Sequence, residues 1–102
     1  LKGRGLSDEE GARWGFVNQI HPADRLMPEA RALAEQLAGG PPLVYAAIKE
    51  IVREAEAMTF QDAMNRITRR QFPTVDILYD SEDQLEGARA FAEKRDPVWK
   101  GR

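Results

Sequence analysis

The chain has 102 residues, no cysteine, and 15 basic against 17 acidic residues, which leave a formal net charge of −2. The absence of cysteine excludes a disulfide framework and a thiolate zinc site, and it favours a cytoplasmic protein. The balanced charge gives no general attraction to nucleic acid or to an anionic membrane, and no stretch approaches the ~20 apolar residues of a membrane span. We therefore expect neither nucleic-acid nor membrane partners.

The first predicted elements are a short helix and a short strand. Ser7 is a good N-cap, and the acidic residues 8–10 suit the positive end of a helix. Gly15 is the residue type that most often ends a helix in the left-handed conformation. Residues 16–20 alternate imperfectly between apolar and polar side chains, which indicates an edge strand.

Two longer helices follow, separated by a glycine- and proline-rich break at residues 39–42. Pro22 and Pro28 mark the entry to the first, whose apolar residues keep helical spacing to about Ala38. The second spans about residues 42–58 and is strongly amphipathic. Its predicted apolar face holds Val44, Ala47, Ile48, Ile51, Ala55 and Met58.

A further helix is predicted to start at Thr59, a candidate N-cap. Pro73 should interrupt this helix, because proline lacks the N–H that the helix interior needs, and we expect a bent or restarted helix up to about Tyr79. The predicted buried side before the break holds Phe60, Ala63, Met64 and Ile67.

The last predicted helix has both ends marked. Ser81 is its N-cap, with Gln84 at the capping-box position, and Pro97 forbids continuation. Gly87 inside the helix costs about 1 kcal/mol relative to alanine, and we interpret it as a site of close packing. The predicted apolar face holds Leu85, Ala88, Phe91 and Ala92.

Both ends of the chain resemble the enoyl-CoA hydratase/isomerase (crotonase) family. The C-terminal end carries SEDQLEG, AFAEKR and P-x-x-K-G, and the N-terminal end carries a small helix that runs into a G-F-V-N stretch at residues 15–18. The resemblance covers the whole chain, but it corresponds only to the last part of such an enzyme. The α/β spiral core, with its oxyanion hole and catalytic glutamates, would lie in a preceding segment.

The resemblance implies a mostly α fold, namely the C-terminal helical oligomerisation domain of a crotonase-like (ClpP/crotonase spiral) enzyme, with at most one short strand from the α/β core. Residues 1–22 would be the end of the core. Residues 23–102 would form the helical oligomerisation and CoA-capping domain. Homo-trimers, often paired into hexamers, are the assembly that this implies.

The implied activity is the reversible addition of water to an enoyl-CoA, with the acyl-CoA thioester as substrate and neither a further cofactor nor a metal. No catalytic residue is carried over, so we expect the 102 residues alone to be inactive. Phe91 and Lys94 match the AF-x-EK pattern whose phenylalanine and lysine reach the adenine-nucleotide end of CoA held by a neighbouring subunit. An aromatic face suits a base, and an ammonium suits a phosphate.

Other interpretations of the same residues stay open. Phe91 is equally compatible with a place in the core, and Lys94 with a solvated partner of the helix dipole. The whole chain could instead be a self-standing helical module that binds a protein through its apolar faces without any CoA function. A third hypothesis uses Arg66, Arg69 and Arg70 to bind nucleic acid, although a salt-bridged helix face is the simpler interpretation of that cluster.

Overall fold

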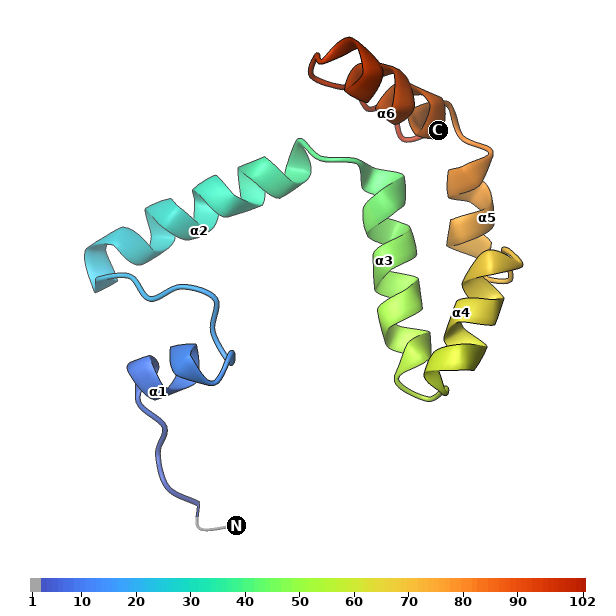
Figure 1. Cartoon of the computed structure of the whole chain (residues 1–102). Helices are drawn as coiled ribbons and strands as arrows, with labels where there is room; N and C mark the ends of the chain where they lie inside the picture. Colours follow the sequence, from blue (N-terminus) through green and yellow to red (C-terminus); the bar gives the residue numbers. More distant parts are fainter. Residues whose placement is uncertain (1–2) are drawn as a thin grey trace. The chain divides into compact units, whose positions relative to one another are not determined.

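The computed structural model describes residues 3–102, which contain six α-helices and no strand (Figure 1). The mostly α fold with at most one short strand is thereby confirmed for these residues. They divide into two compact units, residues 3–37 and residues 38–102, and each is described by itself. The predicted functional division at residue 22 stays a prediction. No helix in the described range is long and apolar enough to cross a bilayer.

The first unit begins with α1 (Asp8–Arg13), which is capped as predicted. The Ser7 hydroxyl accepts a hydrogen bond from the Glu10 N–H at 3.2 Å, and the Glu10 carboxylate accepts from the Ser7 N–H at 3.5 Å. This reciprocal pair is a capping box, which satisfies two N–H groups that the helix cannot satisfy itself. Gly15 follows with φ +76°, the left-handed conformation expected of it.

The strand predicted at residues 16–20 is wrong, because these residues form bends and irregular chain. A strand exists only when a neighbouring strand accepts and donates its backbone hydrogen bonds, and the residues described here offer none. Phe16 is 77% exposed and Ile20 is 46% exposed. The apolar character that suggested a strand is therefore present, but it stays on the surface.

Helix α2 (Ala23–Ala38) is the first of the two longer helices predicted from the sequence. It starts directly after Pro22, whose carbonyl accepts from the N–H groups of Arg25 and Leu26 at 2.9 and 3.0 Å. None of its residues is buried. Leu33 and Leu37 on its apolar stripe remain 45% and 51% exposed.

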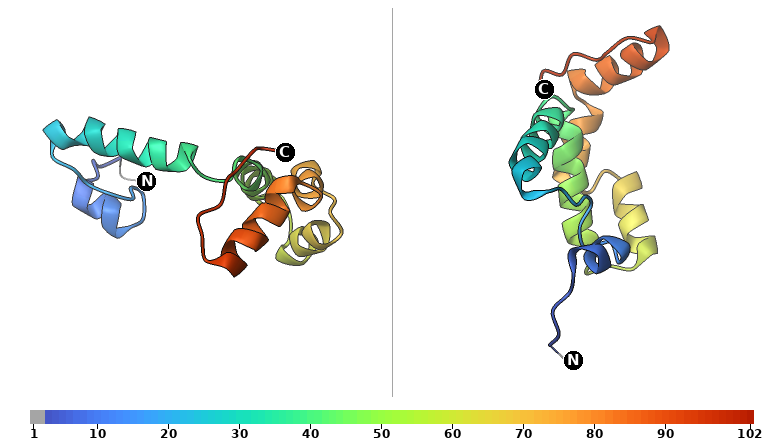
Figure 2. Two further views of the ribbon diagram at one scale, coloured as in Figure 1. Left: turned by 90° about the horizontal axis from the view of Figure 1, so that it is seen from above. Right: turned by 90° about the vertical axis from the view of Figure 1, so that its left-hand side faces the viewer.

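The second unit is built on the packing of α3 (Pro42–Ala55) against α4 (Phe60–Thr68) and α5 (Pro73–Tyr79). The three helices lie side by side in Figures 1 and 2, and α6 (Glu82–Glu93) follows α5. Phe72, with 0% exposure, is the centre of a small core. Around it pack Ala47, Ile51, Ile67, Val75 and Leu78.

The break before Pro73 is a restart rather than a bend. Helix α4 ends at Thr68, Arg70 after its C-cap is left-handed at φ +54°, and α5 begins with Pro73 in its first turn. Phe72 at the N-cap has no side chain that can cap. Glu50 of α3 supplies the acceptor instead, since its carboxylate takes hydrogen bonds from the hydroxyl and, at 2.9 Å, from the N–H of Thr74. This contact lowers the pKa of Glu50.

The buried side predicted for α4 is only partly correct, and the apolar face predicted for α3 is only partly covered. Ala47 of α3 and Ala63 of α4 are buried, whereas Ile48, Phe60 and Met64 are 51%, 80% and 41% exposed. Ile51 of α3 and Ile67 of α4 do pack on the core, so each helix buries only part of its apolar stripe. Phe72, which anchors the core, was not among the residues that the helical spacing indicated.

Candidate functional site

Helix α6 and the C-terminal segment (residues 95–102) form the region to which the predicted site belongs. Ser81 caps the helix as expected, because its hydroxyl oxygen accepts from the Gln84 N–H at 3.0 Å while its own proton goes to the Leu78 carbonyl at 2.7 Å. After the helix ends, the C-terminal segment turns back and runs along α6 (Figure 2). Hydrogen bonds at residues 83, 86, 100 and 101 hold it there.

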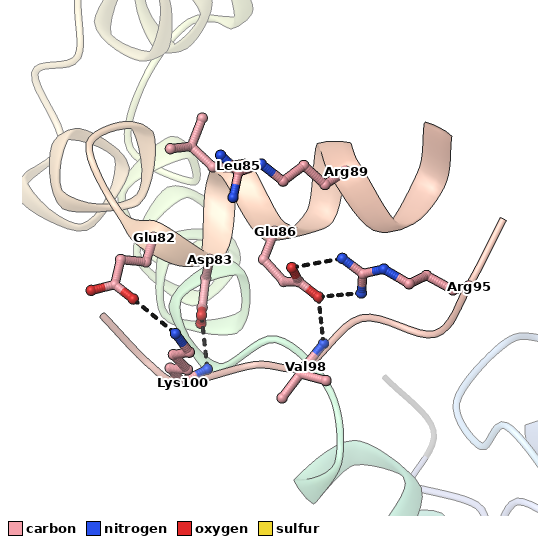
Figure 3. A pocket seen from close by; sticks show the side chains of 8 residues that line it. All are labelled: Glu82, Asp83, Leu85, Glu86, Arg89, Arg95, Val98 and Lys100. Carbon is pink, nitrogen blue, oxygen red and sulfur yellow. Dashed lines mark hydrogen bonds and ion pairs between the residues drawn. The ribbon is translucent and has the colours of Figure 1, made fainter. Parts of the chain in front are cut away.

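Asp83 is the buried anchor of this segment. The residue is only 3% exposed, and one of its carboxylate oxygens accepts from the Lys100 N–H at 2.8 Å (Figure 3). The other accepts from the Gly101 N–H at 2.9 Å. The N–H of Asp83 in turn donates to the Arg102 carbonyl at 3.1 Å. The acidic first turn of α6 therefore does more than complement the helix dipole: it fixes the end of the chain.

Glu86 is the second anchor, one turn further along. Its carboxylate takes two hydrogen bonds from the Arg95 guanidinium, at 2.6 and 3.0 Å, and one from the Val98 N–H at 2.9 Å (Figure 3). The Arg95 fork, followed by the Val98 N–H, lowers the pKa of Glu86 from its ordinary 4.5 to about 2. The same contact, with a further bond to Glu93 at 2.6 Å, raises the pKa of Arg95.

Gly87 lies where the C-terminal segment crosses the helix most closely. A Cβ atom added to Gly87 would lie 3.3 Å from Cη2 of Trp99, closer than side chains ordinarily approach. The sequence-based interpretation of this glycine as a site of close packing is therefore supported, and Trp99 is the partner. The absence of a side chain at residue 87 lets the indole ring lie against the helix.

Lys94 has an unusual backbone conformation for a lysine. It is left-handed, with φ +53°, immediately after the last residue of α6. The Lys94 N–H donates to the Phe91 carbonyl at 3.3 Å, and the Arg95 N–H donates to the Ala90 carbonyl at 3.1 Å. These two bonds form a Schellman motif, in which the left-handed position is usually glycine because a Cβ atom is strained there.

Phe91 is 87% exposed, and within the described residues no other part of this chain covers the apolar face predicted for α6. Its members are Leu85, Ala88, Phe91 and Ala92, all of them exposed. The buried side of the helix holds Asp83 and Ala90 instead, with 3% and 2% exposure. That side meets a chain segment at short range, which favours a small residue and a hydrogen-bonding one over bulky apolar ones.

Together these residues place the two predicted CoA contacts at one exposed helix end. Phe91 and Lys94 are three positions apart in a chain reversal that Arg95 ties back to α6. A separate pocket of about 360 Å³ lies between α6 and the C-terminal segment, and neither residue lines it. Its acids Glu82 and Glu86 are already paired with Lys100 and Arg95. It therefore lacks a free charge pair for acid–base chemistry.

Two of the three arginines of the predicted cluster, Arg66 and Arg70, make contacts within the second unit. Arg66 lies 4.4 Å from the Phe72 ring centroid and 3.8 Å from the Glu54 carboxylate. Arg70 pairs with Asp80 at 2.9 Å and lies 4.7 Å from the Tyr79 ring centroid. This arrangement supports the interpretation of the cluster as a salt-bridged helix face. In the described part of the chain, no three His, Asp or Glu side chains are grouped to hold a metal ion.

Comparison with known proteins gives one consistent result. The family described as enoyl-CoA hydratase/isomerase matches residues 1–102. Carnitinyl-CoA dehydratase of Salmonella paratyphi A is 46% identical over all 102 residues, which correspond to 39% of its length.

Solved structures agree with this match. Enoyl-CoA hydratase subunit I of Geobacillus kaustophilus is 37% identical, with a TM-score of 0.82 over 95% of this chain and 36% of that one. Enoyl-CoA hydratase of Bacillus anthracis is 27% identical, also with a TM-score of 0.82, over 98% of this chain and 37% of that one. The chain therefore spans little more than a third of the relatives it matches. It belongs to the enoyl-CoA hydratase/isomerase family.

Proposed function

We propose that the chain is the C-terminal helical part of a cytoplasmic carnitinyl-CoA dehydratase, which reversibly hydrates crotonobetainyl-CoA. In this proposal the catalytic groups lie in a crotonase core, and the present chain supports subunit assembly and binds the CoA portion of the substrate. The supporting observation is the 46% identity to such an enzyme across the whole chain. We use the term full-length enzyme for a polypeptide that joins this chain to its crotonase core.

The CoA-binding role rests on the exposed end of α6. An 87% exposed phenylalanine contributes little to the fold of this chain, so its ring is free to pack beside a base. Lys94 is also exposed and lies directly after the same helix. Its ammonium would meet a CoA phosphate as a point charge. The Phe91 ring and the Lys94 ammonium thus offer an apolar surface for the adenine base and a positive charge for a phosphate.

Substitution in the full-length enzyme tests this role. We expect Phe91→Ala and Lys94→Ala each to raise KM for the acyl-CoA about tenfold, since loss of one contact of about 1.4 kcal/mol changes an affinity by that factor. Lys49→Ala changes another exposed lysine on α3 and is the matched control, with KM expected to stay unchanged. Unaltered KM in both α6 variants would remove the CoA-binding role.

The assembly role rests on apolar side chains that the second unit leaves exposed. Val52 of α3, Phe60 of α4 and Ile77 of α5 are 58%, 80% and 59% exposed. Burying such side chains against another subunit would remove apolar surface from water, which is the main driving force of association. The full-length enzyme should therefore sediment as a trimer or hexamer. A monomer would contradict the assembly role.

The self-standing interaction module remains the second candidate, because the same exposed apolar side chains would serve a protein partner. Sedimentation of the purified 102-residue chain, together with a CoA-binding titration, separates the two. A stable monomer without affinity for CoA, even when mixed with a crotonase core, would favour the module. Binding to that core would favour the enzyme part.

A further inference from the structure

The turn that presents Lys94 is held by a side chain that does not itself belong to the CoA contact. Glu86 lies two turns before Lys94 on α6, and its carboxylate binds both the side chain of Arg95 and the backbone N–H of Val98. Three hydrogen bonds thus converge on one carboxylate. All of them join the helix to Arg95, directly after Lys94, or to Val98, four residues after it.

This geometry constrains the backbone of Lys94 from both sides. On one side the Lys94 N–H is bonded to the Phe91 carbonyl of α6, and on the other the next residue is bonded to the Ala90 carbonyl and, through its guanidinium, to Glu86. Lysine is strained in the left-handed conformation, so such a turn persists only where its surroundings enforce it. The ion pair between Glu86 and Arg95 and the hydrogen bond from Val98 to Glu86 hold the turn in this conformation.

We propose that Glu86 is a positioning residue for Lys94 in CoA binding. This inference rests on the proposed contact between Lys94 and CoA. Acting through Arg95, Glu86 holds the chain reversal in one conformation and thereby keeps Lys94 at the helix end that carries Phe91, where the two can engage the same nucleotide. Nothing in this role places Glu86 against the substrate.

A matched acid in the same helix distinguishes positioning from general support of the C-terminal segment. Glu82 is also paired with that segment, through Lys100 at 3.2 Å and Arg102 at 3.3 Å. It lies at the other end of α6, so it supports the far end of the segment without touching the turn at Lys94. Glu82→Gln is therefore the control for Glu86→Gln.

The experiment measures kcat and KM of the full-length enzyme with two substrates, the acyl-CoA and the matching acyl-pantetheine thioester, which lacks the nucleotide. With acyl-CoA we expect Glu86→Gln to raise KM about five- to tenfold with kcat unchanged, and Glu82→Gln to leave both within about twofold. With the truncated thioester Glu86→Gln should have no effect. The double variant Glu86→Gln/Lys94→Ala should match Lys94→Ala alone, because the position of an absent ammonium is irrelevant.

The outcomes separate this inference from the function on which it rests. If Lys94→Ala raises KM and Glu86→Gln does not, the positioning role is wrong and the CoA contact stands. If Glu86→Gln impairs both thioesters equally, or adds fully to Lys94→Ala, its role is structural and the inference fails. If Lys94→Ala has no effect, the CoA contact itself is wrong. Should Glu86→Gln not fold, Arg95→Gln removes the same ion pair from the other side and is judged by the same criteria.

Discussion

Residues 3–37 and residues 38–102 both consist of amphipathic helices with well-formed starts, yet they differ in what they bury. The first unit has only Gly11 buried in its helices, and none of the residues of α2 is buried. The second unit encloses Phe72 completely and adds a C-terminal segment held by buried Asp83. The difference shows that a helix can form without burying its apolar stripe, as α2 does, whereas a core needs other helices packed against it.

The largest expected effect tests the core of the second unit. Phe72→Ala should lower the free energy of unfolding by about 3–5 kcal/mol, because it empties a fully buried site. Phe91→Ala makes the same chemical change at an 87% exposed position and should change stability by less than about 0.5 kcal/mol. Urea unfolding of the full-length enzyme measures both. Equal losses would contradict the distinction between the two phenylalanines.

The next effect tests the buried anchor. Asp83→Ala leaves the Lys100 and Gly101 N–H groups without their acceptor and should cost about 2–3 kcal/mol. Hydrogen exchange at these two amides should accelerate before exchange in α3 does. Glu82→Gln, which weakens only exposed ion pairs, is the control and should leave both amides protected. Unchanged exchange in Asp83→Ala would show that the segment is held by other contacts.

A smaller effect, of opposite sign, is expected at the left-handed lysine. Lys94→Gly should raise the free energy of unfolding by about 1 kcal/mol, because glycine adopts φ +53° without strain. The same variant should bind acyl-CoA more weakly. Arg70→Gly relieves the same strain but loses the pair with Asp80, so its gain in thermal stability should be smaller. A Lys94→Gly enzyme with unchanged stability and unchanged KM would contradict both the strain and the contact.

The smallest expected effect is a local response to acid. The pKa of Glu86 is lowered to about 2 in the folded chain from an ordinary 4.5, so its contribution to stability is complete above about pH 4.5 and is lost as the pH falls toward 2. Trp99, which packs on Gly87, reports the release of the segment in a Trp14→Phe background. Its fluorescence should change over this range, and Glu86→Gln should remove that part of the change. An identical acid transition in Glu86→Gln would assign it to another carboxylate.

Sequence reasoning located the helices well because their signals are local. Ser7, Thr59 and Ser81 each accept from the N–H three residues later, and Pro73 restarts the chain as expected. Each signal involves residues within one helical turn.

The AF-x-EK motif placed Phe91 and Lys94 at the end of the last helix, and both are exposed there.

Burial was predicted less well because it depends on residues far apart in the chain. Asp83 and Glu86 are acids near a helix N-terminus, where the helix dipole alone would account for them, yet their partners lie 9 to 18 residues further on. Phe72 went unnoticed because it lies between two helices and so belongs to no helical stripe. The acid-rich first turn before a basic, proline-containing tail was the available signal for the C-terminal segment.

The amino-acid sequence by itself determined where helices begin and end and to which family the chain belongs, because caps, prolines and motif residues act over a few positions. Only the tertiary structure decided that the apolar face of α6 stays exposed, that residues 16–20 form no strand, and that a left-handed lysine is held in place by Glu86. The physical reason is that burial and strand pairing are properties of two surfaces in contact, and a single stretch of sequence specifies only one of them.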